Sequence, residues 1–382
     1  MARIQCSRRG PSRRFLVLAA FGALALGAAT PASAQQTIKL GFIGPLSGGN
    51  AQQGLGARNG FLLAIEQANK GGYPFKVEPV VLDDASDPQT GVSAALKLVN
   101  DRDVVAATGH WNSPVALATT PVFSRSGMPF IVWGAISPRI TEQNFPEVTR
   151  VTPTLLQENK PLAELMAKQM GVKTVGLISD TSDYGVNNTK SFTEFFTAAG
   201  GKVVSTDAAP VGTTDFRAIL TRVKGANPDA VYFGGVITEA ALVRRQMIEL
   251  GLNVPMFGIS GIYDPKLIEI AGEAANGTVV GVPKVQANPK LDAFEKAYKE
   301  RNFPEPPGSY AKFAYDAAGI LLQAIREAGP TDKRKIAQTI RGISYDGVLG
   351  KTTFDANGQT QIPVEINVFT VRDGKWQPHQ GS

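Results

Sequence analysis

The sequence predicts an α/β protein of two doubly wound parallel-sheet (Rossmann-like) lobes, joined by a hinge of several chain crossings, with a ligand in the inter-lobe cleft. Strand-like and helix-like patterns alternate in two successive runs. Helical patterns of about 10–15 residues separate the strands, which is the arrangement of parallel βαβ units. The chain of 382 residues is 43% hydrophobic and 19% charged, a globular composition that is long enough for two domains.

Apolar periodicity places the elements of both runs. In the first run we expect strands at 37–44, 75–84, 104–109 and 129–134, and helices at 51–69, 88–100 and 114–125. In the second run we expect strands at 173–179, 229–235, 256–260 and 278–284, and helices at 156–170, 187–198, 215–227 and 238–251.

The last hundred residues are more helical and have no sheet of their own. Helical patterns at 289–301, 309–328 and 332–341 precede a segment, 351–376, whose D-x-N-G and R-D-G turns are typical of antiparallel hairpins. We therefore expect this segment to complete both lobes. The first lobe would comprise 35–153 and 284–365, and the second lobe 154–283 and 366–382. A chain that crosses several times between lobes forms a hinge and a cleft.

The first 34 residues have the three-part layout of a secretory signal peptide. Arginines without acidic residues begin the chain, an apolar run of about 15 residues follows, and Ala32-Ser33-Ala34 forms an A-x-A cleavage site. The apolar run is shorter than the roughly 20 residues that span a bilayer. We predict cleavage after Ala34 and export to the periplasm. The segment 12–17 also fits a twin-arginine signal.

Charge, cysteine and histidine content exclude several function classes. Five N-terminal arginines supply most of the formal net charge of +6, so the exported chain gives no support to nucleic-acid binding. The single cysteine, Cys6, precedes the cleavage site. Only two histidines and no G-x-S-x-G motif occur, so we expect no catalytic residues and no metal site, and we expect His110 to bond a backbone carbonyl. The glycines at 54–60 have the spacing G-x-G-x-x-x-G inside a predicted helix, so we expect no cofactor.

Candidate binding residues follow the strands, because ligands of open parallel sheets bind beyond the carboxyl ends of the strands. Trp111, Asn112 and Ser113 follow the strand 104–109, and Trp133 ends the strand 129–134. Aromatic and neutral hydrogen-bonding side chains suit a concave site for a small, partly apolar ligand. The pair Ser113-Pro114 predicts a helix N-cap followed by proline at the first helical position, where free N–H groups attract an anion.

A family resemblance extends over roughly residues 37–376 of the chain. It rests on TIKLGFIGPLSG, DDASDP, TGHWNSP, WGAISP, DTSDYG, DAVYFGG and SYAKFAYDAAG, in this order. With these motifs the chain resembles the leucine/isoleucine/valine-type periplasmic binding proteins, type I solute-binding proteins that deliver a ligand to ABC permeases. The resemblance implies a monomer with a small-molecule ligand and membrane permease subunits as partners. A ligand sensor of the same fold without a transport role is the alternative.

The resemblance also implies binding residues. The ligand carboxylate would be held by the serine after the third strand, Ser113, and by the loop after the fourth strand, which is Gly134, Ala135, Ile136 and Ser137. The positions that hold aromatic side chains in the family correspond to Gln53, Tyr184, Val236 and Tyr310. The acid that holds the ligand's amino group corresponds to Ser260.

The serine at position 260 carries information about the ligand. A buried ammonium without a carboxylate partner costs several kcal/mol, so an α-amino acid loses its expected counter-charge unless Glu239, in the neighbouring loop, substitutes. Trp111 and Trp133 add flat apolar surface. We therefore expect an amine-free carboxylate, preferably an aromatic acid, with branched-chain amino acids next and amides or urea-like ligands behind them.

Overall fold

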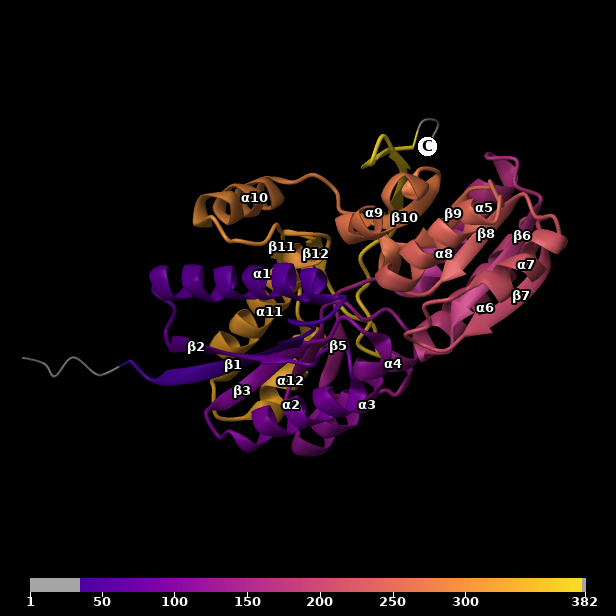
Figure 1. The fold of residues 1–382 in the computed structure, drawn as a ribbon. Helices are drawn as coiled ribbons and strands as arrows, with labels where there is room; N and C mark the ends of the chain where they lie inside the picture. The colour runs from indigo at the N-terminus through magenta and orange to yellow at the C-terminus, as the bar shows by residue number, and fades with distance from the viewer. Residues whose placement is uncertain (1–34, 380–382) are drawn as a thin grey trace, which may run out of the picture. The chain divides into compact units, whose positions relative to one another are not determined.

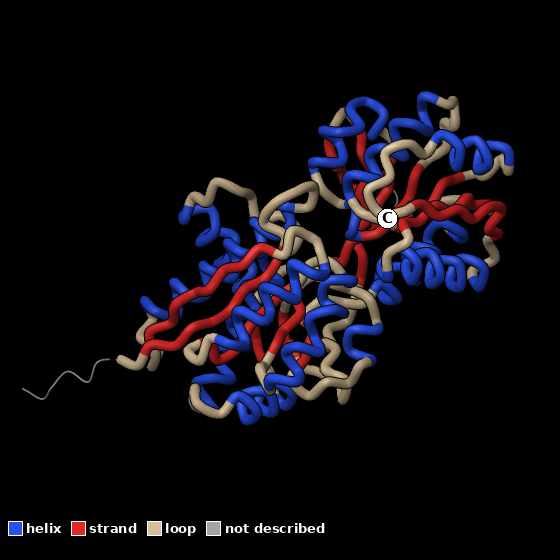
Figure 2. Tube along the Cα trace, turned by 60° about the horizontal axis from the view of Figure 1, so that its bottom comes forward, coloured by secondary structure: helices blue, strands red, loops and turns tan. Residues whose placement is uncertain are grey.

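The computed structural model describes residues 35–379, which form two mainly parallel sheets, each with helices on both faces. The predicted signal peptide and its cleavage site at Ala34 lie outside the described residues. Figure 2 shows the two groups of strands with helices on either side of each group. The predicted α/β class with parallel-sheet lobes is confirmed.

The first sheet has five parallel strands in the order β2-β1-β3-β4-β5. They are β1 (Thr37–Gly44), β2 (Lys76–Asp83), β3 (Val104–Gly109), β4 (Phe130–Val132) and β5 (Val148–Arg150). Side chains of β1 alternate between the two faces of the sheet, as strand geometry requires. Phe42 packs in the core with helices α1 (Ala51–Lys70) and α11 (Ala311–Ala328), whereas Ile43 packs with α2 (Pro88–Asn100) and α3 (Ser113–Ser126).

The second sheet repeats this topology and adds an antiparallel edge. Its order is β14-β13-β10-β9-β8-β6-β7, and its parallel strands are β6 (Thr174–Asp180), β7 (Lys202–Ala209), β8 (Ala230–Gly234), β9 (Met256–Ile259) and β10 (Thr278–Lys284). Helices α5 (Leu155–Lys168) and α6 (Asp183–Ala198) pack on one face, and α7 (Arg217–Gly225) and α8 (Ile237–Glu249) pack on the other. The segment after β9 holds two 3-10 turns, Ser260–Ile262 and Gly272–Ala275, on either side of α9 (Pro265–Ala271).

The C-terminal part of the chain divides between the two sheets. Helices α10 (Pro289–Arg301), α11 and α12 (Lys333–Gly342) precede the short strands β11 (Tyr345–Gly347) and β12 (Gly350–Thr352). Helix α11 packs against α1 and the first sheet, and α12 packs against α11 and β5; Figure 1 shows both in orange beside the indigo and violet elements. Strands β13 (Glu365–Arg372) and β14 (Lys375–Pro378) then form the antiparallel edge of the second sheet. The chain thus passes between the sheets after β5, after β10 and before β13.

The structure differs from the expected elements in four places. Strand β5 was not predicted, because it is three residues long and ends in the fully buried Arg150, which breaks the apolar pattern. Helix α6 begins at Asp183 and not at 187, since Ser182 caps it through a hydrogen bond from Gly185 N. The D-x-N-G segment makes only an isolated antiparallel bridge, whereas the R-D-G turn does join β13 to β14. The short helix α4 (Arg139–Glu142) was also not predicted.

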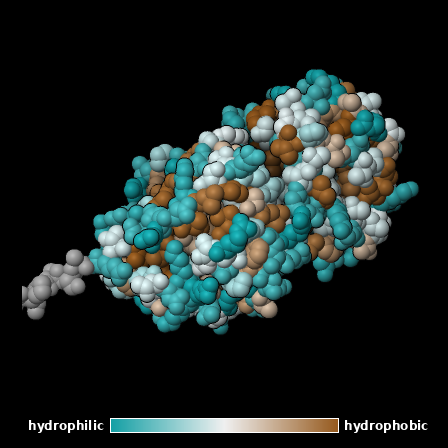
Figure 3. Space-filling view, turned by 90° about the horizontal axis from the view of Figure 1, so that it is seen from below, coloured by the Kyte–Doolittle hydropathy of each residue, from teal (hydrophilic) through white to brown (hydrophobic). Residues whose placement is uncertain are grey.

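Within residues 35–379, no helix has the length and apolar content needed to cross a membrane. On the face drawn in Figure 3, hydrophobic side chains form patches between hydrophilic areas. Val186 and Val211 are the most exposed of the large hydrophobic side chains, at 50% and 60%.

Candidate functional site

A cavity of about 630 Å³ is lined by residues that follow the strands of both sheets. Helices α1, α2 and α3, after strands of the first sheet, and α6 and α8, after strands of the second, begin at its wall, and Tyr310 at the start of α11 also lines it. The parallel strands of the two sheets have the same spatial order. In open α/β sheets, ligands bind beyond the carboxyl ends of the strands, at the point where the strand order changes direction, and the loops that line this cavity follow the strands at that point.

The structure brings most of the predicted site residues to this main cavity. The following line it: Trp111, Asn112, Ser113, Gly134, Ile136, Tyr184, Val236 and Tyr310. They come from loops that are far apart in sequence, and the cavity size falls within the range of small-molecule sites.

Four predicted residues lie behind the wall of this cavity. Trp133 is fully buried, stacks on Phe42 with 5.6 Å between ring centroids and is a core side chain. Ala135 is buried as well, and its carbonyl accepts a hydrogen bond from Arg150. Ser137 donates its hydroxyl to Asp183 Oδ2 at 2.7 Å. Gln53 donates its side-chain amide to Asp264 in the segment after β9.

The start of α3 differs from the starts of α2, α6 and α8 at the cavity. Asp87 caps α2, while Asp183 and Glu239 lie in the first turns of α6 and α8 and complement the positive ends of those helices. Helix α3 has no acidic residue in its first turn, and its N-cap side chain, Asn112, makes no capping hydrogen bond. The starts of α1 and α11 share these two features, but only α3 also presents a hydroxyl, that of Ser113, in its first turn. The positive end of α3 is therefore free to attract an anion and has a side-chain donor beside it.

Ser113 connects the two loops that the sequence predicts for a carboxylate. It is the first helical residue and not the N-cap, a correction that places Asn112 at the cap and proline one position later than expected. Ser113 Oγ accepts a hydrogen bond from Ser137 N at 3.1 Å, which ties the loop after β4 to the start of α3. The hydroxyl hydrogen of Ser113 stays available for an acceptor in the cavity.

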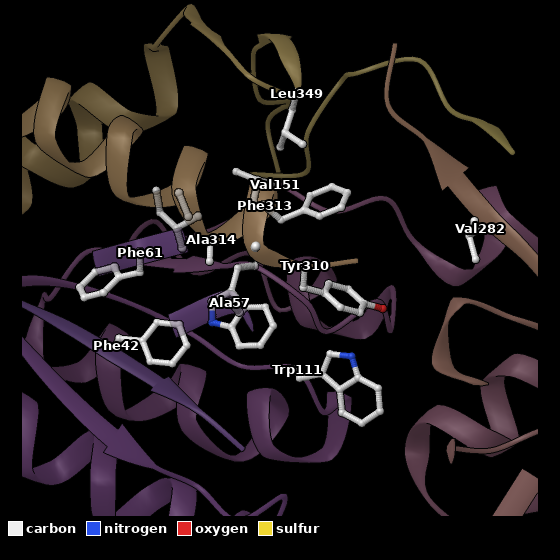
Figure 4. Close-up of a cluster of buried hydrophobic side chains, with 14 of the residues drawn as sticks. Phe42, Ala57, Phe61, Trp111, Val151, Val282, Tyr310, Phe313, Ala314 and Leu349 are labelled. Atoms are coloured by element: carbon white, nitrogen blue, oxygen red, sulfur yellow. The ribbon is translucent and has the colours of Figure 1, made fainter. Parts of the chain in front are cut away.

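Aromatic side chains form the apolar part of the wall. Trp111 and Tyr310 pack edge to face with 6.3 Å between centroids, and Trp133 supports Tyr310 from behind at 6.0 Å. Figure 4 shows Tyr310 and Trp111 side by side, with the Tyr310 hydroxyl pointing away from Phe42. Tyr184 is 7% exposed, and its hydroxyl has no hydrogen-bond partner among the described residues. Burial raises the pKa of Tyr184 well above its ordinary value, so the hydroxyl stays neutral.

Arg150, which the sequence analysis did not single out, shapes the loop after β4. Its guanidinium is fully buried and donates to the carbonyls of Ala135 and Ser137 and to Thr141 Oγ1. Each of these acceptors is neutral. In the sequence, the short strand Val148–Arg150 with its terminal arginine resembles the exposed edge strand of a sheet. Only the packing of the folded chain shows that Arg150 is buried and holds the loop after β4.

Acidic side chains are more abundant at the cavity than the sequence suggested. Asp180, Asp183 and Glu239 line it, and no lysine or arginine is among its lining residues. Glu239, the expected substitute acid, accepts a hydrogen bond from Gly212 N at 3.0 Å. Burial, together with the charge of Glu239, raises the pKa of Asp180.

Position 260 is not without an acid in its surroundings. Ser260 N donates to Glu158 Oε2 at 3.1 Å, and both residues line a smaller cavity that also includes Tyr310. Burial raises the pKa of Glu158 to about 7, and the nearby backbone N–H and hydroxyl of Ser260 oppose that shift. The absence of an acid at position 260 therefore does not by itself disfavour an amine-bearing ligand.

His110 bonds a carboxylate and not a backbone carbonyl. Its Nδ1 lies 2.7 Å from Asp84 Oδ2, and both side chains are fully buried. The pair lies below the loops and does not line the main cavity. No group of three or more potential metal-ligating side chains occurs in the part of the chain that the structure describes.

Comparison with known proteins identifies the family. A family model described as periplasmic binding protein matches residues 37–375. The chain belongs to the periplasmic binding protein family. A leucine-, isoleucine-, valine-, threonine- and alanine-binding protein of Pseudomonas aeruginosa is 31% identical over 342 residues, which are 88% of this chain and 91% of the relative.

Two solved structures of this periplasmic binding protein fold contain different ligands. A branched-chain amino acid transporter substrate-binding protein of Streptococcus pneumoniae, in complex with isoleucine, is 27% identical, with a TM-score of 0.81 and coverage of 90% and 98% of the two chains. An ABC transporter solute-binding protein of Rhodopseudomonas palustris, in complex with 3,4-dihydroxybenzoic acid, is also 27% identical, with a TM-score of 0.77 and coverage of 89% and 95%. Periplasmic binding proteins bind solutes and are not enzymes.

Proposed function

We propose that this chain is the extracytoplasmic substrate-binding component of an ABC importer of the branched-chain amino acid type. It captures a small carboxylate ligand with an apolar body in the main cavity, and the two lobes close on it. The lobes of this proposal comprise 35–153 with 284–365 and 154–283 with 366–382. Export to the periplasm and recognition of the closed form by permease subunits complete the proposal.

The single observation that carries the ligand class is the free start of α3 at the wall of an aromatic-lined cavity. Ser113 supplies a hydroxyl and a backbone N–H there, and no acidic side chain occupies that helix end. A carboxylate gains both charge-assisted hydrogen bonds and the helix dipole at such a position. Trp111, Tyr184 and Tyr310 provide the surface for the apolar body.

Two ligand types fit this description. Aromatic acids suit the flat surfaces of Trp111 and Tyr310, and a relative with a similar structure binds 3,4-dihydroxybenzoic acid. Branched-chain amino acids suit the same carboxylate position, and the acids of the second lobe offer partners for their ammonium group.

Isothermal titration of the exported chain with leucine, isoleucine and a series of benzoates tests the proposal. We expect at least one of these carboxylates to bind with micromolar or tighter affinity. The variant Ser113→Ala should weaken that ligand about tenfold, because one hydrogen bond to a charged group is lost. Arg102→Met, at an exposed position that lines neither cavity, should leave the affinity unchanged. If no carboxylate binds, the proposed function is wrong.

A further inference from the structure

A small recess adjoins the main cavity. It measures about 30 Å³ and shares Ile136 and Tyr310 with the main cavity. Glu158, at the start of α5, and Ser260, directly after β9, provide the remaining polar groups that matter here. A space of this size holds one water-sized chemical group.

The carboxylate in the recess has no cationic partner among the described residues. Glu158 is 1% exposed, and its one well-formed hydrogen bond comes from the backbone N–H of Ser260, whose hydroxyl lies close to the same carboxylate. Neither cavity is lined by a lysine, an arginine or a histidine. A buried carboxylate with a single donor is costly, so a further hydrogen-bond donor or a cation at this point is favourable.

Two hydroxyl groups near this carboxylate are also without partners. Ser260 Oγ is buried close to Glu158 and Tyr310 but makes no hydrogen bond of good geometry, and the Tyr184 hydroxyl at the adjoining main cavity has no partner among the described residues. Buried polar groups in folded proteins are nearly always satisfied. The recess therefore has the composition of a site for one small polar group that arrives with a ligand.

We propose that Glu158, Ser260 and Tyr310 form a second polar subsite, which binds a hydrogen-bond-donating group of the ligand, either an ammonium or a hydroxyl, while the ligand carboxylate lies at the start of α3. In this subsite, Glu158 of α5 provides the carboxylate that is missing at position 260, because it lies next to Ser260. This inference rests on the proposed function and narrows its ligand class to carboxylates that carry a donor group.

Glu158 is the group in the recess that changes its charge near neutral pH, because the titratable side chains around it are tyrosines. Tyr184 of α6, Tyr232 of β8 and Tyr310 before α11 are near it, and burial raises the pKa of each, so all three stay neutral. A donor-bearing ligand favours the ionised form of Glu158, so its affinity should rise between pH 6 and pH 8. A carboxylate ligand without a donor should show the opposite trend.

Two matched ligand pairs test the subsite by isothermal titration of the exported chain. Leucine and 4-methylpentanoate differ only in the ammonium group, and 4-hydroxybenzoate and benzoate differ only in the hydroxyl group. In at least one pair we expect the donor-bearing member to bind about tenfold more tightly, the effect of one hydrogen bond to a charged acceptor.

Two substitutions of Glu158 distinguish an ammonium from a hydroxyl as the donor group of the ligand. Glu158→Gln keeps an acceptor but removes the charge, so it should abolish the advantage of an ammonium and reduce that of a hydroxyl only partly. Glu158→Met removes both charge and acceptor and should abolish either advantage. Glu164→Gln, on the same helix and outside both cavities, is the matched control and should keep the advantage. If Glu158→Met does not fold, Ser260→Ala takes its place and should reduce the advantage.

Equal affinities within both pairs, or an advantage that survives both Glu158 substitutions, would overturn the subsite. Those results would leave the proposed function intact, because the carboxylates would still bind. If no member of either pair binds, the proposed function itself fails and the subsite fails with it.

Discussion

At the scale of single residues, Gly261 and Tyr184 show how closely the cavity wall is packed. A Cβ atom at Gly261 would collide with the hydroxyl and ring of Tyr184. We predict that Gly261→Ala displaces Tyr184 and weakens ligand binding at least tenfold, with a loss of about 1–3 kcal/mol in stability from overpacking. Titration calorimetry and urea unfolding measure the two effects. Gly225→Ala, where a Cβ atom would meet nothing within 4 Å, should leave affinity unchanged.

Glu158 should also make the stability of the protein depend on pH. Its folded-state pKa of about 7 lies above the ordinary value of 4.5, because burial disfavours the charged form. The contribution of this group to stability is therefore present at low pH and is lost as the pH rises from about 4.5 to 7. Relative to the unsubstituted chain, the free energy of unfolding of Glu158→Gln should rise by up to about 3 kcal/mol when the pH is raised from 5 to 8.

Urea unfolding at both pH values measures this difference. Glu164→Gln should follow the pH dependence of the unsubstituted chain. A stability difference for Glu158→Gln that stays constant with pH would contradict the assignment.

Single residues also mark how much of the site the sequence can predict. Ser113 and Trp111 follow a recognisable strand, so the rule that ligands bind after strands finds them. Glu158 lies in the polar segment QENK, which resembles an exposed helix start, and it is buried only because α5 packs against β9 and β10. Trp133 has the composition of a site residue, yet the alternation along β4 turns it toward Phe42.

At the scale of elements, the free start of α3 makes a separate prediction. Asn112→Asp would place a carboxylate at the helix end that we assign to the ligand. We expect the ligand-free protein to gain about 0.5–1 kcal/mol, since an acid at the N-cap complements the helix dipole. The affinity for carboxylate ligands should fall at least tenfold.

Thermal unfolding and calorimetry measure both changes. Asn357→Asp adds the same charge in the exposed turn before β13 and should leave the affinity unchanged. Unaltered binding by Asn112→Asp would mean that the ligand carboxylate lies elsewhere.

Most elements were predictable because their apolar periodicity is strong. Helices α2 and α10 and strand β10 begin and end at the predicted residues. The exceptions have physical causes: β5 is short and contains a buried arginine, and the first turn of α6 is polar and includes Gly185, where a Cβ atom would collide with Asp180 and Gly234. Apolar periodicity does not reveal such elements, because their residues are determined by close contacts with other parts of the fold and not by an apolar face.

At the scale of the whole molecule, Asp183 connects elements of the two sheets. It accepts a hydrogen bond from Ser137 and forms an ion pair with Arg139, both in the segment after β4. We predict that Asp183→Ala favours the open form and weakens ligand binding several-fold, mainly through faster dissociation. Asp207→Ala, which breaks an ion pair with Arg222 within the second sheet and its helices, should have no such effect.

Labels can report this closure directly, because Cys6 precedes the predicted cleavage site and the exported chain has no other cysteine. Cysteines at the exposed positions Leu96 and Ile248 allow fluorescence energy transfer between α2 and α8. Ligand should change the transfer efficiency, and Asp183→Ala should reduce the change. A transfer efficiency that does not respond to bound ligand would contradict hinge closure.

Binding of a ligand carboxylate at the start of α3 can be tested by comparing carboxylates with their amides. Isothermal titration of leucine against leucinamide and of benzoate against benzamide changes only the group that should meet Ser113. For whichever ligand type binds, we predict that the carboxylate binds at least about tenfold more tightly than the amide, because the charge-assisted hydrogen bonds and the helix dipole act on the anion. An amide that binds as tightly as its carboxylate would mean that the ligand carboxylate does not bind at the start of α3.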